Sequence, residues 1–236
     1  MLPMLSVFAI YILAAILPAA FLMRYIYRKD KVEKEPPRLL FSLIVWGVIA
    51  ALVSIALEYL GIRILSSLVD RNNPSYILIF AFLVVAAVEE GTKFFFLIQR
   101  TWRDPNFNYR FDGIVYAVFI SLGFAAFENI RYVMGYGLTT ALPRAVLAIP
   151  GHMGFAVFMG LFYGRAKVFS SRGSRKAKNV NLFAGYISAV ALHGFYDACA
   201  MIGTVMATMV FLAFVIIMYV VVIRMVRRQS ALDKPI

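Results

Sequence analysis

The sequence predicts an all-α membrane protein, a bundle of about seven transmembrane helices. Of its 236 residues, 62% are hydrophobic and only 15% are charged, whereas soluble domains are about half apolar and about a quarter charged. A soluble globule of this size could not bury so much apolar surface. The composition therefore excludes a soluble enzyme, a disordered chain and a fibrous repeat. The single cysteine, Cys199, excludes an internal disulfide framework and a cysteine-based zinc cluster.

The apolar stretches are long enough to cross a bilayer seven times, within one membrane domain over residues 1–236. A spanning helix needs about 20 mostly apolar residues. The expected spans are 4–23, 39–60, 76–99, 112–134, 144–164, 182–203 and 205–223. A tight turn near Gly203 separates the last two, and the pattern also leaves room for an eighth or re-entrant segment.

Positive charge alternates between the two ends of these spans. Of the 24 Lys and Arg residues, 19 follow the first, third, fifth and seventh spans, and four lie on the other loops and span ends. Because Lys and Arg gather in cytoplasmic loops, we expect the N-terminus outside and the C-terminus in the cytoplasm. The first span has its positive charges behind it, which predicts an anchor rather than a cleaved signal peptide. The net charge of +12 then reflects topology, with the bilayer and not a nucleic acid as partner.

A few ionisable residues lie well inside the apolar stretches, where each is a functional candidate because its burial is costly. They include both histidines of the chain and are Glu89, Glu90, Lys93, Glu128, His152, His193 and Asp197. At about 1.5 Å per helical residue, the histidines fall near mid-membrane and Glu128 and Asp197 toward the outer leaflet. Glu89 and Glu90 fall several Å further inward. We nevertheless expect one shared cavity, open toward the outer half of the membrane.

The third span carries two adjacent glutamates and a lysine. Glu89 and Glu90 precede Lys93 by four and three residues, spacings that place them on one helix face. Two neighbouring carboxylates in a low dielectric cannot both ionise freely, so we expect Lys93 to keep one charged while the other holds a proton. Such a pair can supply an acid and a base. The alternative is an ion pair that only locks helices together.

The later spans add one carboxylate and the two histidines. Glu128 is expected to point inward, because small residues such as Gly123 allow close helix approach there, with a pair to Arg131 as the alternative. His152 could be a ligand-facing group or an ordinary interhelix hydrogen bond. His193 and Asp197 are four residues apart and share a face, so the carboxylate can orient the imidazole.

Four motifs in order resemble the PrsW family of bacterial intramembrane proteases. They are Glu-Glu-x-x-Lys at 89–93, Phe-x-x-x-Glu at 124–128, an isolated intramembrane His at 152 and His-x-x-x-Asp at 193–197. The family is similar to the glutamate-type CAAX prenyl endopeptidases, which have His where this chain has Glu128 and Arg where it has Lys93. The resemblance implies an endopeptidase of the bacterial cell membrane. It would cut a single-pass anti-sigma factor near its extracytoplasmic boundary and so start regulated intramembrane proteolysis under envelope stress.

The residues leave three chemistries open. In glutamate-type hydrolysis, which needs no cofactor, Glu89 or Glu90 activates water, while His152 and His193 stabilise the oxyanion and Asp197 orients His193. A zinc protease is the second reading, because two histidines and the carboxylates suffice as ligands, although no His-Glu-x-x-His is present. A proton-coupled transporter is the third, since such residues also form proton relays, but paired halves with interrupted helices are absent from the sequence.

Overall fold

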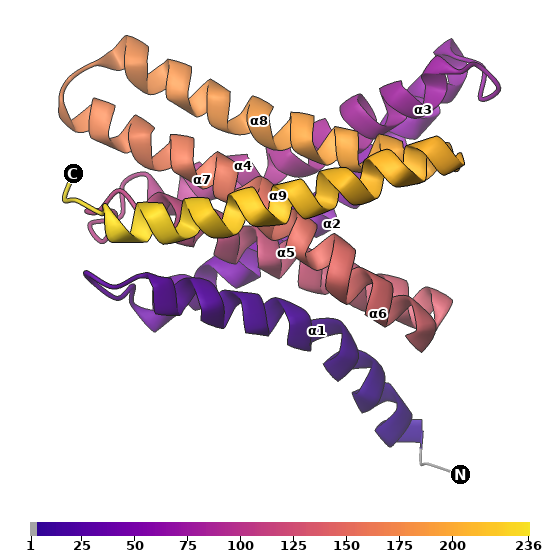
Figure 1. Cartoon of the computed structure of the whole chain (residues 1–236), viewed down its shortest axis with the longest axis horizontal. Coiled ribbons are helices and arrows are strands. Elements are labelled where there is room, and N and C mark those ends of the chain that lie inside the picture. Colours follow the sequence, from indigo (N-terminus) through magenta and orange to yellow (C-terminus); the bar gives the residue numbers. More distant parts are fainter. Residues whose placement is uncertain (1–3) are drawn as a thin grey trace.

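The structure, a computed structural model that describes residues 4–236, confirms the all-α class (Figure 1). Within that range the chain contains no strand and folds into seven continuous helical segments. Short π- and 3-10-helical turns, named η, lie inside two of the segments. The elements are α1 (Met4–Lys29), α2 (Pro37–Leu68), α3 (Ser75–Ile79), η1 (Phe80–Ala86), α4 (Ala87–Thr101), α5 (Asp112–Tyr136), η2 (Leu138–Thr140), α6 (Ala141–Pro143), η3 (Arg144–Ala148), α7 (Ile149–Ser171), α8 (Arg175–Ile202) and α9 (Val205–Ala231).

Five of these segments are long and apolar enough to cross a membrane, judged by length and composition. They are 8–29, 37–68, 112–136, 138–171 and 205–231. The remaining two, 75–101 and 175–202, carry most of the ionisable residues singled out above. Gly203, with a φ of 72°, makes the expected tight turn between α8 and α9. These are separate helices of 28 and 27 residues, so no re-entrant segment replaces them.

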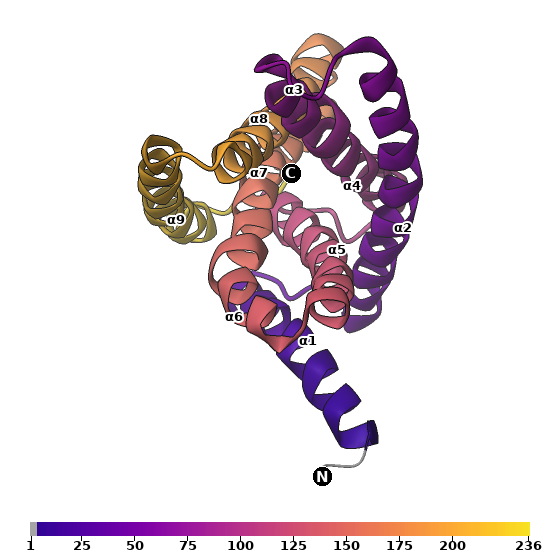
Figure 2. The same ribbon diagram turned by 90° about the vertical axis from the view of Figure 1, so that its right-hand side faces the viewer.

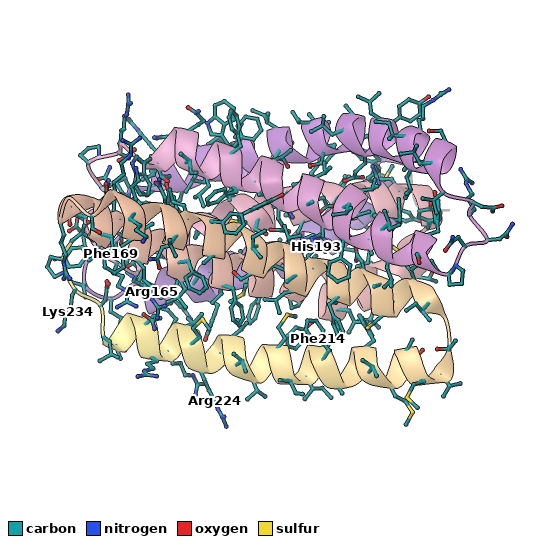
Figure 3. All side chains as sticks on the ribbon, turned by 90° about the horizontal axis from the view of Figure 1, so that it is seen from above. Arg165, Phe169, His193, Phe214, Arg224 and Lys234 are labelled. Atoms are coloured by element: carbon teal, nitrogen blue, oxygen red, sulfur yellow. The ribbon has the colours of Figure 1, made fainter. Side chains whose placement is uncertain are left out.

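The turns richest in Lys and Arg gather at one end of the bundle, which we call the basic end. It comprises residues 30–36, 102–111, 172–174 and the tail 232–236. Figure 1 places the C-terminus beside the turn between α1 and α2, and Figure 3 places Arg165 and Lys234 at the same end. The charge alternation along the chain thus corresponds to a separation in space. Which side of the membrane this end faces stays a prediction.

Helix α5 forms the centre of the bundle, and α1 and α9 lie at its edge (Figure 2). The most apolar stretch of α5 is 78% buried, against 22% for α1 and for α9. Glycine permits the closest crossing, where α2 meets α5: a Cβ built on Gly123 would lie 2.5 Å from the carbonyl oxygen of Ile44. Without a hydrophobic force between helices in lipid, such close backbone packing is a main source of association.

This crossing gives a stability prediction with a control on the same helix. Gly123→Ala should destabilise the bundle by about 1–3 kcal/mol or more, because the new methyl group meets backbone atoms that cannot move aside. Gly135→Ala should be neutral or stabilising by up to about 1 kcal/mol, since nothing lies within 4 Å of its Cβ position. Thermal unfolding of the two purified variants in detergent measures the difference. Equal melting temperatures would contradict the packing described.

Candidate active site

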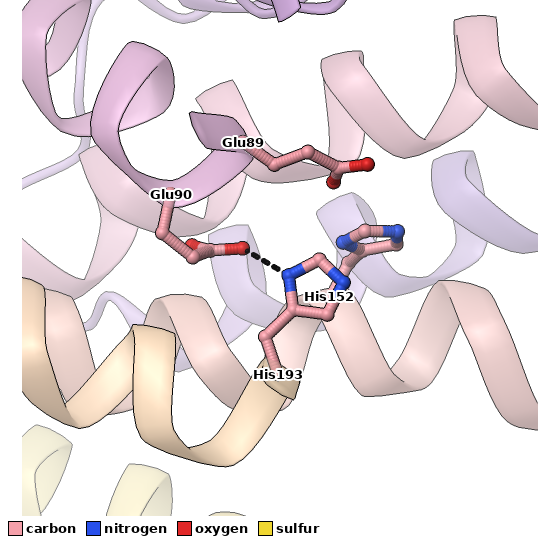
Figure 4. A group of neighbouring side chains, drawn as sticks. All are labelled: Glu89, Glu90, His152 and His193. Carbon is pink, nitrogen blue, oxygen red and sulfur yellow. Dashed lines mark hydrogen bonds and ion pairs between the residues drawn. The ribbon is translucent and has the colours of Figure 1, made fainter. Parts of the chain in front are cut away.

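Four side chains from three helices meet near the middle of the bundle, where Figure 3 places His193. Glu89 and Glu90 come from α4, His152 from α7 and His193 from α8, and Figure 4 shows the four turned toward one another. Oε1 of Glu90 lies 2.9 Å from Nδ1 of His193. All four residues are at most 5% exposed. The structure therefore brings together residues that are up to 104 positions apart in the sequence.

Lys93 lies behind these residues and neutralises the two glutamates. Its Nζ donates hydrogen bonds to Glu90 Oε1 at 2.7 Å and to Glu89 Oε2 at 3.2 Å. The ammonium also lies over the ring of Phe124, 4.0 Å from its centroid, a favourable cation–π contact. Removal of the lysine charge would leave buried carboxylates without a cation, which costs several kcal/mol.

His152 lies between Lys93 and Glu128. Its Nδ1 is 3.4 Å from the Lys93 ammonium and its Nε2 is 3.1 Å from Glu128 Oε2. An ammonium group can only donate, so Nδ1 accepts and Nε2 carries the proton that is donated to Glu128. The two imidazole rings also meet edge to face, with centroids 5.3 Å apart.

Glu128 and Asp197 complete the polar site on the side away from the basic end. Glu128 accepts a hydrogen bond from Arg144 Nη2 at 2.9 Å, so Arg144 takes the place that the alternative interpretation gave to Arg131. Asp197 Oδ2 lies 3.4 Å from Nε2 of His193. His193 therefore has a carboxylate at each ring nitrogen, and the stacked ring of Phe155, 4.8 Å away between centroids, fixes its plane.

A cavity of about 670 Å³ gives access to this cluster. Glu89, Glu128, His152, His193 and Asp197 line it, whereas Glu90 and Lys93 do not, so the expectation that both glutamates face one cavity is wrong for Glu90. The walls also include Ile62, Pro143 and Met201, which lie near helix ends opposite the basic end. The cavity thus runs from the middle of the bundle toward that end, in a size range typical of ligand sites.

The expected depth mismatch of Glu89 and Glu90 is absent. Helix α4 continues through Gly91 without a break, but the π-helical turn η1 immediately precedes it. A second π-helical turn, η3, precedes α7, which carries His152. A π-helical turn holds more residues than an α-helical one and is frequent at functional sites. A depth estimate that assumes the α-helical rise for every residue therefore places the segments that carry Glu89, Glu90 and His152 at the wrong height along the bundle axis.

The structure adds two residues to the site that the sequence analysis missed. Arg144 appeared only as a positive charge at a span end, yet it binds Glu128 and Asn129 and lines the cavity. Glu58 also lines the cavity. It lies inside the expected span 39–60, and the cost of a carboxylate in an apolar stretch could have identified it.

The inner cluster also has the donor set of a metal site. One ligand atom each from Glu89, Glu90, His152 and His193 lies within 4.8 Å of the others, and Glu90 Oε2 is buried without a hydrogen-bond partner. Two imidazoles and two carboxylates suit zinc. The ammonium of Lys93 supplies positive charge at the same place. The cluster thus fits either an ion or an internal lysine as the charge that balances its glutamates.

Comparison of the sequence with known proteins identifies related membrane proteases. The family model described as PrsW family intramembrane metalloprotease matches residues 35–225. The chain is 33% identical over 184 residues to Protease PrsW of Geobacillus kaustophilus, covering 78% of this chain and 76% of that one. It is 31% identical over 217 residues to Protease PrsW of Oceanobacillus iheyensis, covering 92% and 94%.

Protease PrsW of Clostridioides difficile is 32% identical over 211 residues, covering 88% of this chain and 86% of that one. No solved structure matches the chain at a significant level. These matches favour a peptidase over the proton-coupled transporter that the same buried residues also allow. The chain belongs to the PrsW family and is an intramembrane protease.

Proposed function

We propose that the protein makes the first cut in a single-pass membrane protein such as an anti-sigma factor, in the bacterial cell membrane. The observation that carries the proposal is the cavity, which leads from the end opposite the basic end to Glu89 in the middle of the bundle. If the basic end faces the cytoplasm, the cavity opens on the extracytoplasmic side. A substrate segment that unwinds near that membrane boundary would then reach the carboxylate.

In this mechanism Glu89 is the general base. Its Oε2 accepts a hydrogen bond from Lys93, whereas its Oε1 has no hydrogen-bond partner among the described residues, and the side chain lines the cavity. Glu89 would remove a proton from water as the water oxygen attacks the scissile carbonyl carbon, and would later deliver that proton to the leaving amine. The carbonyl π electrons move onto oxygen, and N–H donors lining the cavity stabilise this oxyanion.

The neighbouring residues support that step. His152 and His193 would provide the N–H donors by sharing with the oxyanion the protons that they donate to Glu128 and to a neighbouring carboxylate, and Arg144 adds a positive charge at the cavity wall. Asp197 and Glu90 orient His193 through its two ring nitrogens. Glu90, which is fully buried and bound to Lys93, acts as a positioning residue rather than as the base.

Reconstitution tests the proposal. The purified protein in liposomes should cut a single-pass anti-sigma factor once, at a bond near the membrane boundary opposite the basic end, and mass spectrometry of the products locates that bond. A scrambled transmembrane segment of the same composition serves as control substrate. Cleavage of only soluble peptides, or of a bond at the basic end, would contradict the proposed direction of access.

Zinc-dependent cleavage of the same substrate is the second candidate, favoured by the four converging ligand atoms. Glu89, Glu90, His152 and His193 would hold the ion, which would supply Lewis-acid activation of water. Chelation should then abolish turnover and zinc should restore it. Turnover that persists in chelator, with no bound metal found by elemental analysis, supports the glutamate mechanism instead.

Lys93 offers a separate test of the electrostatics. Lys93→Met should lower activity and move the pH optimum upward, because loss of the positive charge makes the neighbouring carboxyl groups harder to deprotonate. Lys93→Arg keeps the charge and should shift the optimum much less. A pH–rate profile of kcat/KM for the three proteins gives the answer. An unshifted optimum for Lys93→Met would show that the lysine does not tune the base.

A further inference from the structure

Four carboxylates meet at the basic end, far from the candidate active site. We call them the carboxylate cluster: Asp30 and Glu35 in the turn before α2, Asp112 at the start of α5, and Asp233 in the tail. One oxygen each from Asp30, Asp112 and Asp233 lies within 4.8 Å of the others. Asp30, Glu35 and Asp112 are at most 4% exposed. The turn before α2, the start of α5 and the tail therefore bring their carboxyl groups together in one buried region.

Among the described residues, no Lys or Arg side chain forms an ion pair with this cluster. Within residues 8–236, no Lys or Arg nitrogen lies within 4.0 Å of any of the four carboxylates. The nearby Lys34 donates to the backbone carbonyls of Tyr27 and Asp30 instead. Buried carboxylates in proteins are normally paired, bound to a metal or neutralised by a proton, so this arrangement suits a bound cation.

Several polar atoms at the cluster also lack hydrogen-bond partners. They are Oδ2 of Asp30, Oε2 of Glu35 and the hydroxyl of Tyr116, all buried. Orphaned buried oxygens cost free energy unless an unseen group binds them.

We propose that the carboxylate cluster binds one hard divalent cation, such as Ca²⁺ or Mg²⁺. The donors are all oxygen, which such ions prefer over nitrogen and sulfur. Two ligands at a Ca²⁺–oxygen distance of about 2.4 Å can lie at most about 4.8 Å apart, and the separations of the three aspartate oxygens do not exceed this limit. Glu35 lies close enough to Asp30 and Asp112 to interact with them electrostatically, and it would supply a further oxygen for the higher coordination number of Ca²⁺.

The ion would join the tail to the rest of the basic end. The tail already pairs with the turn before α5, since Arg110 N donates to Lys234 O and Ile236 N to Asn108 O. Asp233 also accepts from the backbone N–H of Phe111 at 2.8 Å. The site lies 16 residues along α5 from Glu128, about 24 Å. The cation would therefore hold the fold together at this end without taking part in hydrolysis.

A thermal-stability titration tests the proposal on the full chain in detergent. After chelation and dialysis, Ca²⁺ or Mg²⁺ should raise the melting temperature in a saturable way, by at least about 5 °C at a hundredfold excess over Kd. Calorimetry should give one ion per chain. The same ionic strength from NaCl should give no saturable rise, which separates binding from charge screening.

Variants locate the ion. Asp30→Asn combined with Asp112→Asn should abolish the rise, whereas Asp70→Asn, an exposed acid at the opposite end, should leave it unchanged. Asp233→Asn alone keeps an oxygen for Phe111 N and should weaken apparent affinity about tenfold, because affinity follows the ligand charge. This single variant tests the site even if the double variant does not fold. No saturable rise in the wild type, or an undiminished rise in Asp233→Asn, would overturn the proposal.

Discussion

Glu89→Gln is expected to abolish cleavage while membrane insertion and melting temperature stay close to those of the wild type. The amide keeps the size and hydrogen-bond acceptor of the side chain but cannot take a proton from water. A general base contributes about 10²- to 10⁴-fold to rate, and Glu89 both takes the proton from water and returns it to the leaving amine, so its loss should leave turnover near background. Initial rates on a reconstituted single-pass substrate measure the effect.

Glu58→Gln is the matched control for this change. Glu58 lines the same cavity, but no hydrogen bond or ion pair joins it to Lys93 or to either histidine. The same substitution there should cause only a modest loss. Glu90→Gln should impair turnover through the orientation of His193. If Glu89→Gln kept full activity while Glu90→Gln was inactive, Glu90 rather than Glu89 would be the general base.

His193→Ala is expected to lower kcat by about 10²-fold or more, because an oriented imidazole that donates or transfers a proton contributes that much. The ring is held by Glu90 and Asp197 and stacked on Phe155, so water cannot easily take over its role. KM should change less than kcat, since His193 lies beside the reacting atoms rather than along the whole cavity. Steady-state kinetics separates the two parameters.

Phe195→Ala provides the control on the same helix. Phe195 is two residues further along α8 and is 38% exposed, packed against Phe214. Its truncation should leave kcat near the wild-type value. If His193→Ala also retained near-wild-type kcat, the imidazole would be a structural contact between α4 and α8 and not part of the catalytic machinery.

Much of the fold was predictable from the sequence because the bilayer restricts the options. Apolar stretches of sufficient length must form helices, and Gly203 marks the turn between the last two. The buried ionisable residues were predictable for the same reason, since each is costly in an apolar segment. His193 and Asp197 lie on one face as their spacing predicts.

The pairing between helices was not predictable in the same way. Glu128 binds Arg144, 16 residues away across a chain reversal, rather than Arg131 on its own helix. Helix rotation and the π-helical turns η1 and η3 decide such partners, and neither has a sequence pattern of its own. For the same reason the different positions of Glu89 and Glu90, one at the cavity and one behind it, required the structure.

The native cysteine allows the most direct test of the central claim, that a substrate is cut in this cavity beside Glu89. Cys199 lines the cavity and lies six residues beyond His193 on α8, about 9 Å along the helix. An extended substrate covers that distance in about three residues. Cys199→Ala should cleave at the wild-type rate, because the thiol has no part in the mechanism.

Disulfide trapping in the Glu89→Gln enzyme uses this probe. Substrates that each carry one cysteine, at successive positions around the scissile bond, are reconstituted with the enzyme and oxidised. Crosslinking requires Cα atoms within about 7 Å. We predict a yield that peaks within about three residues of the bond cut by the active enzyme and vanishes with Cys199→Ala. A peak elsewhere along the substrate, or none while the active enzyme still cuts, would contradict the assignment of this cavity as the active site.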